Sequence, residues 1–390
     1  LPQAPRRLNL HHGSGNMDIK QELKAEAGRL GFPFAGVTSL DPPPHLDTFE
    51  AWIAAGRQAG MGYLADPLSR QKRADPRSVL PAAKSILSLA MPYAPSGPPA
   101  VEPATGRVAS YAWGTDYHDV IPARLTQLAD RIEARLGCQV ARRAYTDTGP
   151  ILERSLAQRA GLGWQGKNTC LIHPQSGSYF FLAELFLDLD LEPDEPFRSD
   201  HCGTCRRCIE ACPTSCIRED RTLDSARCIS YQTIENKEPI PHALRPQLGN
   251  WVFGCDICQQ VCPWNRFAHE TPIEESFQAR PGVPAPRLLD ELRLDAHGFN
   301  QKFRLSPVRR TKRRGYLRNV CIALGNAGHE AAAPHLLNLL DTEPEGFIRG
   351  AAAWAAYRLD PGIALPRLEQ AAGSDPDPLV REDIRITLAG

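Results

Sequence analysis

Two different spacings of hydrophobic residues run through the first half of the chain. Apolar residues recur every three or four positions, as in amphipathic helices, in three segments: 18–30, 121–136 and 151–160. Nearly continuous apolar runs of strand length occupy two others: 85–91 and 179–187. Helices that alternate with strands are typical of α/β architecture. We therefore predict an α/β domain over residues 17–190, a flexible tail at 1–16 and a proline-rich loop at 92–103.

The last third of the chain has a helical pattern that repeats. Three short motifs align, with their arginines 31 and then 32 residues apart: Leu317-Arg318-Asn319-Val320, Ile348-Arg349-Gly350-Ala351 and Val380-Arg381-Glu382-Asp383. Repeats of this length in helical segments predict stacked helix pairs of the HEAT type, and three helices that align by chance are the alternative. We place a linker and this repeat domain in residues 276–390.

The composition limits the class of protein. A chain of 390 residues can form two or three domains, each with its own core. No apolar stretch approaches the length of about 18 residues that a membrane span needs, and residues 1–16 lack the apolar segment of a signal peptide. We expect a cytoplasmic protein without membrane association. The sequence has no heptad pattern or apolar interface stripe, so we expect a monomer.

The charges balance overall but not locally. The chain has 45 basic and 45 acidic residues, yet residues 302–318 contain basic residues and no acidic one. These basic residues are Lys302, Arg304, Arg309, Arg310, Lys312, Arg313, Arg314 and Arg318. A solvated helix face normally mixes both signs, so this segment predicts an anion-binding surface.

Eight of the twelve cysteines follow an iron-sulfur pattern. The first block, Cys202-x2-Cys205-x2-Cys208-x3-Cys212-Pro213, is the run with which bacterial ferredoxins bind [4Fe-4S] clusters, and its fourth cysteine ligates the other cluster. The second block, Cys255-x2-Cys258-x3-Cys262-Pro263, supplies three thiolates, and Cys228 completes eight. We therefore predict a ferredoxin-like domain with two [4Fe-4S] clusters at residues 191–275.

The interleaved pattern also assigns the ligands. One cluster takes Cys202, Cys205, Cys208 and Cys262, and the other takes Cys212, Cys228, Cys255 and Cys258. Cys216 is the alternative to Cys228, and structural zinc is the alternative to iron. Zinc ribbons usually pair two Cys-x2-Cys knuckles, which disfavours zinc here. Cys138, Cys170 and Cys321 lie in helix-like or strand-like segments and are interpreted as buried small hydrophobic residues.

Two further motifs are weaker than they look. Gly161-x4-Gly166-Lys167 resembles a phosphate-binding loop, but Asn168 occupies the position where such a loop has a Ser or Thr whose hydroxyl binds magnesium. A phosphate-binding loop also follows a strand, whereas the residues before Gly161 have a helical pattern. We interpret the first glycines as the end of that helix. Asp116-x-His118 resembles a cobalt-binding loop of corrinoid proteins but lacks its glycine, so these residues alone do not show cobalamin.

Several motifs together resemble the epoxyqueuosine reductase family, whose members complete queuosine at the wobble base of tRNA. With Arg73 they span residues 73–265, and Ser306-Pro307-x-Arg309-Arg310 extends the resemblance into the repeats. Besides the two cysteine blocks they are Tyr111-Ala112-Trp113-Gly114-x-Asp116-Tyr117-His118, Asp147-Thr148-Gly149-Pro150, Ala160-Gly161-Leu162-Gly163-Trp164-x-Gly166-Lys167-Asn168, Cys228-Ile229-Ser230-Tyr231, Gly254-Cys255-Asp256-x-Cys258 and Cys262-Pro263-Trp264-Asn265.

The resemblance implies a cofactor and a reaction. The family resembles reductive dehalogenases in pairing a corrinoid with two [4Fe-4S] clusters, so it implies cobalamin in the α/β domain. The implied reaction removes the epoxide oxygen of epoxyqueuosine with two electrons and two protons, and the cofactor supplies the chemistry that side chains cannot. The implied corrinoid contacts are Arg73, Tyr111, Trp113, Asp116, Tyr117, His118, Lys167 and Leu171, although Trp113 and Tyr117 could equally be core aromatics.

The resemblance also implies that Asp147 protonates the leaving oxygen. A free aspartate has a pKa of about 3.9, so Asp147 would act as an acid only if burial raised that pKa. The alternative is a turn residue before a helix that starts at Pro150.

The basic segment then has a candidate partner in tRNA. We expect its residues to meet the tRNA phosphates, which contribute affinity without sequence recognition, while splayed anticodon-loop bases provide specificity. The expected contacts are Arg309, Arg310, Lys312, Arg313 and Arg318. Two alternatives remain: a dehalogenase-like corrinoid enzyme acting on a small molecule, and a non-catalytic electron-transfer module with two clusters. An electron-donor protein or another reductant is required in each case.

Overall fold

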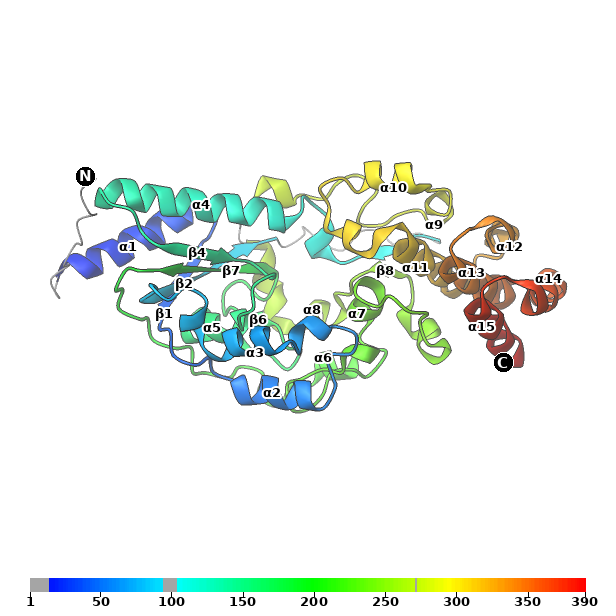
Figure 1. Cartoon of the computed structure of the whole chain (residues 1–390), viewed down its shortest axis with the longest axis horizontal. Coiled ribbons are helices and arrows are strands. Elements are labelled where there is room, and N and C mark those ends of the chain that lie inside the picture. The colour runs from blue at the N-terminus through cyan, green and yellow to red at the C-terminus, as the bar shows by residue number, and fades with distance from the viewer. Residues whose placement is uncertain (1–13, 94–103, 271) are drawn as a thin grey trace.

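The computed structural model describes residues 14–93, 104–270 and 272–390 and is elongated, with the α/β part at one end and the helical repeats at the other (Figure 1). Most of the predicted loop at 92–103 and of the tail at 1–16 lies outside the described residues. Within the described part of the chain, no helix is both long and apolar enough to cross a membrane.

A four-stranded antiparallel sheet forms the α/β part. Its strand order is β1-β2-β7-β4. The strands are β1 (Phe34–Thr38), β2 (Ser85–Pro92), β7 (Phe180–Leu187) and β4 (Arg142–Tyr145). Helices α1 (Ser14–Arg29) and α4 (Tyr117–Leu136) cover one face, while α2 (Leu46–Ala54), α3 (Pro67–Ala74) and α5 (Glu153–Arg159) lie on the other side (Figure 1).

The predicted strands are the two central ones. Because helices cover both faces, β2 is buried at every position, which explains the continuous apolar run in place of an alternating one. The predicted helices are also present with shifted bounds. Helix α1 begins inside the predicted tail, α4 begins four residues earlier than its apolar pattern, and α5 begins at Glu153 instead of Ile151. Gly161 follows α5 with φ 84°, as expected for a glycine that ends a helix.

The cysteine segment contains only short elements. These are α6 (Arg207–Glu210), α7 (Ile229–Ile234), β8 (Trp251–Phe253) and α8 (Ile257–Gln260), with the hairpin β5 (Trp164–Gln165) and β6 (Leu171–Ile172) preceding them in the chain. Strand β8 pairs in parallel with β3 (Arg107–Val108), which comes from the first half of the chain. Residues near β3 therefore pack in the same hydrophobic cluster as the repeats.

The proline-bearing segment that we expected to be a linker is held in place. The amide of Gly106 donates to the carbonyl of Pro286 at 2.7 Å, and the amide of Val108 donates to the carbonyl of Pro284 at 3.2 Å. This segment therefore lies along β3 and forms part of the C-terminal body.

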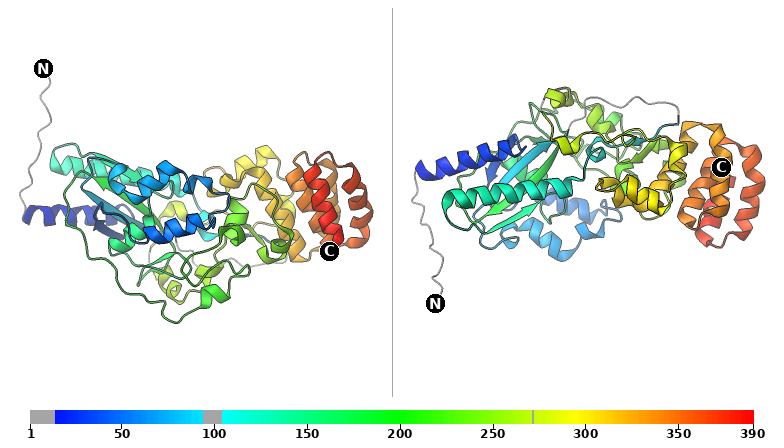
Figure 2. Two further views of the ribbon diagram at one scale, coloured as in Figure 1. Left: turned by 60° about the horizontal axis from the view of Figure 1, so that its bottom comes forward. Right: turned by 90° about the horizontal axis from the view of Figure 1, so that it is seen from above.

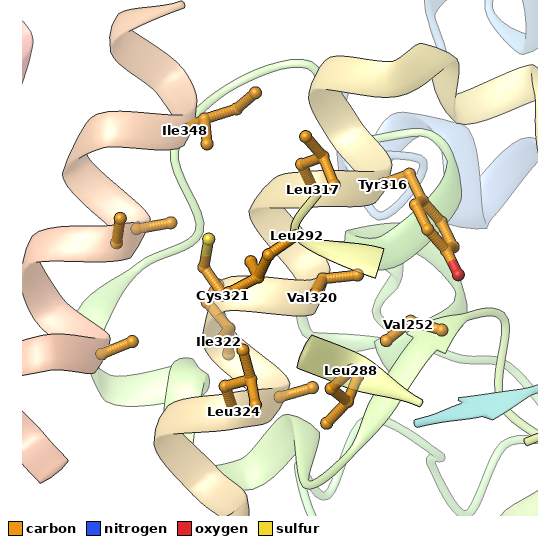
Figure 3. Packing of buried hydrophobic residues seen from close by; sticks show 14 of the residues in the cluster. Val252, Leu288, Leu292, Tyr316, Leu317, Val320, Cys321, Ile322, Leu324 and Ile348 are labelled. Atoms are coloured by element: carbon orange, nitrogen blue, oxygen red, sulfur yellow. The ribbon is translucent and has the colours of Figure 1, made fainter. Parts of the chain in front are cut away.

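The repeat prediction is confirmed. The C-terminal helices are α9 (Leu288–Glu291), α10 (Ala296–Lys302), α11 (Lys312–Ala327), α12 (Ala333–Thr342), α13 (Gly346–Leu359), α14 (Pro361–Ser374) and α15 (Pro378–Ala389). The three aligned motifs fall in α11, α13 and α15, which pack side by side in one stack (Figure 2). Helix α11 is buried because it lies between α13 on one side and α9 and β8 on the other (Figure 3).

Candidate active site and cofactor cavity

A cavity of about 1510 Å³ lies where the three parts of the chain meet. Its wall combines Asp147 of the α/β part, Cys228 of the cysteine segment and Arg310 just before the repeats. Pockets for drug-sized ligands measure roughly 300–1,000 Å³, so this cavity can accommodate a larger group such as a macrocycle.

Five of the eight predicted corrinoid contacts line this cavity. They are Arg73, Tyr111, Asp116, Tyr117 and His118. Arg73 is 6% exposed, lies 5.6 Å from the ring of Phe49, and its Nη1 has no hydrogen-bond partner among the described residues. Burial lowers the pKa of Arg73, and a buried donor without an acceptor costs free energy. An acceptor on a bound cofactor would satisfy this nitrogen, so the wall fits a large polar ligand.

The other three predicted contacts are not among the residues that line this cavity, and for them a corrinoid contact stays a prediction. Trp113 is a core residue whose Nε1 donates to the carbonyl of Val108 at 2.7 Å. Lys167 donates through Nζ to the carbonyls of Gly203 and Cys205, beside the first cysteine block. Leu171 is buried in an apolar cluster under the sheet. Sequence motifs cannot separate such supporting residues from those that face the cavity.

A hydrogen-bonded group surrounds Asp147. The hydroxyl of Tyr117 donates to Asp147 Oδ2 at 3.0 Å, and Nε2 of His118 lies 3.4 Å from the same oxygen. On its other side, Nδ1 of His118 lies 2.7 Å from Asp116 Oδ1. Asp116 is also the N-cap of α4, where its side chain accepts from the amide of His118. This cap places two consecutive side chains, Tyr117 and His118, in the cavity wall.

The charges in this group differ from the sequence-based expectation. Burial lowers the pKa of His118, but its contacts with Asp116 and Asp147 outweigh burial and raise the pKa to about 9. For Asp147, desolvation raises the pKa, but contacts with His118 and Tyr117 and the charge of Arg310 give a net lowering. Asp147 is therefore ionised at neutral pH. The condition that burial raises its pKa is not met, and the proton resides on His118.

Sequence reasoning missed Glu153, which holds the Asp147 backbone. Asp147 has a left-handed backbone with φ 59°, unusual for a residue with a side chain, and its amide donates to Glu153 Oε1 at 2.5 Å. Glu153 also lines the cavity. The pattern offered no signal for this role, because an acidic residue in the first turn of a helix is ordinary.

The structure brings the predicted cluster ligands together in the two expected groups. Cys202, Cys205, Cys208 and Cys262 line one small pocket together. Cys212, Cys228, Cys255 and Cys258 lie close enough to interact electrostatically with one another. Cys228 faces the large cavity, so a cluster held by the second group would adjoin whatever the cavity binds.

Two of the other cysteines lie beside the second group. Cys216 Sγ is 3.5 Å from Cys212 Sγ and also contacts Cys228, so it stays an alternative ligand. Cys170 contacts Cys258. Cys321 has a packing role, since it is fully buried in the repeat core (Figure 3).

The basic segment divides into an exposed part and a buried part. Arg309, Arg310, Lys312 and Arg313 line the cavity near the start of the repeats. Arg310 forms an ion pair with Glu235, and Arg313 forms a bidentate ion pair with the buried Glu343. Arg309 and Lys312 are exposed and form no ion pair among the described residues.

Arg318 contradicts the prediction of a surface contact. It is 1% exposed, and its guanidinium donates to the carbonyls of Gln232, Asn236 and Glu238. It therefore joins helix α11 by hydrogen bonds to α7 and to the segment after it, and it is not available to a nucleic acid.

Three family models match the chain in sequence order. "Epoxyqueuosine reductase QueG, DUF1730" matches residues 73–148, "4Fe-4S double cluster binding domain" matches 201–265, and "HEAT repeats" matches 311–389. The second match covers both cysteine blocks and confirms the prediction of two [4Fe-4S] clusters over the zinc alternative.

Curated relatives match most of the chain. An epoxyqueuosine reductase of Pseudomonas aeruginosa is 39% identical over 344 residues, covering 87% of this chain and 94% of the relative. An epoxyqueuosine reductase of Leadbetterella byssophila is 41% identical over 307 residues, covering 78% of this chain and 97% of the relative.

Solved structures share the whole fold. A crystal structure of epoxyqueuosine reductase with an epoxyqueuosine-modified tRNA-Tyr stem loop superposes with a TM-score of 0.88 at 30% identity, covering 96% of this chain and 99% of that one. Epoxyqueuosine reductase from Streptococcus thermophilus gives a TM-score of 0.85 at 31% identity with the same coverage. The chain therefore belongs to the epoxyqueuosine reductase family, whose members reduce epoxyqueuosine in tRNA to queuosine, and it contains a domain for two [4Fe-4S] clusters.

Proposed function

We propose that the large cavity is the place where epoxyqueuosine of tRNA loses its epoxide oxygen. The observation that carries this proposal is the composition of one wall: a cluster cysteine, Cys228, an acid-base group around Asp147 and a cationic rim from residues 309–313 all face the same space. Cobalamin, when bound, supplies the reduction of the carbon-oxygen bond that side chains cannot perform. Arg73 and Tyr111 would hold the corrinoid.

The protein contributes the proton. We assign to His118 the role of proton source and to Asp147 the role of the group that passes this proton to the leaving oxygen. Tyr117 orients the carboxylate because its hydroxyl donates to the same oxygen that His118 contacts. Since His118 is protonated and Asp147 is ionised at neutral pH, the proton moves from the imidazolium through the carboxylate as the oxygen leaves.

The rim provides the tRNA contacts. Arg309 and Lys312 have no acidic partner among the described residues, so they remain free to neutralise phosphates of the anticodon stem-loop. Arg310 and Arg313 would contribute less, because Glu235 and Glu343 already pair with them. The modified base would enter the cavity splayed out of the loop, which is how proteins usually read single-stranded RNA.

The remaining roles follow from the same arrangement. We assign cobalamin binding and catalysis to residues 17–190, electron relay to 191–275 and tRNA binding to 276–390. A separate one-electron donor would feed the first cysteine group, which lies outside the large cavity. The protein would act as a monomer in the cytoplasm, and light scattering after size-exclusion chromatography tests its oligomeric state.

The test is metal content together with turnover. Anaerobically purified protein should contain about eight iron atoms per chain for two cubane clusters and should bind cobalamin in an amount equal to that of the protein. With a chemical reductant it should convert epoxyqueuosine in tRNA to queuosine. An electron-transfer module would contain iron without binding cobalamin. A small-molecule corrinoid enzyme would bind both but leave the tRNA nucleoside unchanged.

A further inference from the structure

A buried carboxyl group lies directly behind the cavity. Glu184 sits in the middle of β7, a central strand of the sheet (Figure 1), and is 0% exposed. Its cross-strand neighbours are Ser88 on β2 and Tyr145 on β4. Within the described residues, neither oxygen of Glu184 receives a hydrogen bond, and the Ser88 hydroxyl also has no partner. No cation in the described part of the chain lowers the pKa of this carboxyl.

The group that faces Glu184 is a second carboxyl. The side chain of Glu153, at the start of α5, adjoins that of Glu184, and α5 packs on β7. Two adjacent carboxylates repel each other, and neither ionises easily away from water. Burial, followed by the charge of Asp147, raises the pKa of Glu153 to about 8, and burial raises that of Glu184 well above its ordinary value. At neutral pH the pair therefore keeps at least one proton.

That proton can be the donor which the pair otherwise lacks. If one carboxyl is protonated, its O–H can donate to the opposite carboxylate, and the unpartnered oxygens of Glu184 are then explained. Other charged groups near Glu153 are Arg154, Asp147 and His118. Arg154 and His118 lower the pKa of Glu153, but their effect is smaller than that of burial.

The pair is connected to the reaction site through the Asp147 loop. Glu153 Oε1 accepts from the amide of Asp147 at 2.5 Å, and Glu153, Asp147 and His118 all line the cavity. Glu184 has no exposed surface and adjoins Glu153, so Glu153 connects it to the cavity.

The reaction consumes two protons at one oxygen. Opening of the carbon-oxygen bond leaves an oxygen that takes the first proton, and its departure as water with formation of the double bond takes the second. The clusters and a bound corrinoid would supply the two electrons. The His118–Asp147 pair can deliver one proton per turnover before it must be reloaded.

We propose that Glu153 and Glu184 share a proton that serves as the second proton of epoxide removal. Glu153 acts at the cavity wall, where burial favours its protonated form, and Glu184 is a positioning residue that faces it. This inference rests on the proposed function of the cavity. It adds a second proton store to the His118–Asp147 pair.

Two variants test the proposal with a readout that needs no turnover. Infrared spectra of the resting holoenzyme at pH 7 should show the carbonyl stretch of a protonated carboxylic acid. The band should shift in Glu184→Gln and in Glu153→Gln, because each loses one member of the pair, and it should disappear in the double variant Glu153→Gln/Glu184→Gln. It should stay unchanged in the control Glu369→Gln, which alters an exposed carboxyl of α14. A wild-type spectrum without this band, a double variant that retains it, or single variants in which it does not shift would overturn the shared proton. If Glu184→Gln does not fold, Glu153→Gln carries the test.

The second readout is the pH profile of single turnover with epoxyqueuosine-containing tRNA. In Glu184→Gln the carboxyl of Glu153 faces a neutral amide, so its pKa should fall and the alkaline limb of the rate should move down by about one pH unit or more. At pH 8 the variant should be at least about tenfold slower, with unchanged cobalt and iron content.

The combined outcomes separate this proposal from the proposed function. A wild-type band that disappears in the double variant, together with an unchanged pH profile in Glu184→Gln, would show that the pair exists but supplies no proton to the reaction, and the proposal would fail. If the wild-type holoenzyme does not reduce the tRNA nucleoside at all, the proposed function fails and this second-proton role fails with it. The infrared result would still decide whether the carboxyl pair holds a proton.

Discussion

Nε2 of His118 lies 3.4 Å from Oδ2 of Asp147, close enough for an ion pair, yet that nitrogen makes no aligned hydrogen bond within the described residues. The two residues are 29 positions apart and come from the start of α4 and from the loop after β4. This contact keeps the carboxylate ionised and the imidazole protonated, and the chemistry that we propose depends on it.

Replacing Asp147 should separate cofactor binding from turnover. We expect Asp147→Asn to bind cobalamin and both clusters like the wild type, but to turn over about 10²- to 10⁴-fold more slowly, the usual range for removal of a proton-transfer group. Cobalt and iron analysis and single-turnover assays measure the two effects. A variant with near-wild-type rates would remove Asp147 from the mechanism.

The charge of His118 should be visible in its titration. NMR of labelled histidine should give a pKa near 9 for His118, well above its ordinary value of 6.5. In Asp116→Asn the pKa should fall, because one of the two carboxylates that stabilise the imidazolium is gone. An ordinary pKa in the wild-type protein would contradict the proposed proton source.

The same shift should make stability depend on pH. Because the folded-state pKa lies above 6.5, this ionisation stabilises the folded protein fully below about pH 6.5 and ceases to do so as the pH rises through about 9. Between these limits, the free energy of unfolding should decline more in the wild type than in His118→Gln. Denaturant titrations at matched ionic strength measure the difference, and parallel pH dependences would refute the linkage.

The exposed cations should set the salt dependence of tRNA binding. The double variant Arg309→Ala/Lys312→Ala should bind tRNA more weakly. The slope of log affinity against log salt should become shallower by roughly 0.7–0.9 for each phosphate that the variant no longer neutralises. Arg29→Ala, on α1 at the far end of the molecule (Figure 1), is the control and should change neither value. Equal slopes for the double variant and the wild type would leave the rim without this role.

Arg318 should matter for stability. Arg318→Met removes the donor to three carbonyls around α7 and should cost on the order of 3 kcal/mol in the free energy of unfolding, because buried acceptors are left without their partner. The neighbouring exposed Arg314→Met should cost much less. Thermal or denaturant unfolding compares them, and tRNA affinity of the folded Arg318 variant should stay close to that of the wild type.

Iron analysis should decide between two neighbouring cysteines. Cys228→Ser should lower the iron content from about eight atoms per chain toward four, whereas Cys216→Ser should keep about eight. The reverse result would make Cys216 the ligand. The two thiols contact each other in the second group, so either one lies in position to be the fourth ligand, and the two variants distinguish them.

Local patterns determined a large part of this protein. The apolar runs of β2 and β7, the repeat of α11, α13 and α15, and the cysteine spacing were all readable from the sequence. Each of these features depends on residues that are near each other in the chain, or on a regular spacing of apolar residues that follows from burial of one face. The strands β1 and β4 escaped prediction because short edge strands carry too few apolar residues to stand out.

The tertiary structure alone decided where the charges lie. It placed Arg318 in the core beside the carbonyls of a distant segment, and it joined His118 to Asp147, and Glu153 to Glu184. In the sequence, Glu184 was only an acidic interruption of an apolar run. The protonation state of a side chain depends on its burial and on charges within a few ångströms, and residues far apart in the chain supply both only after folding.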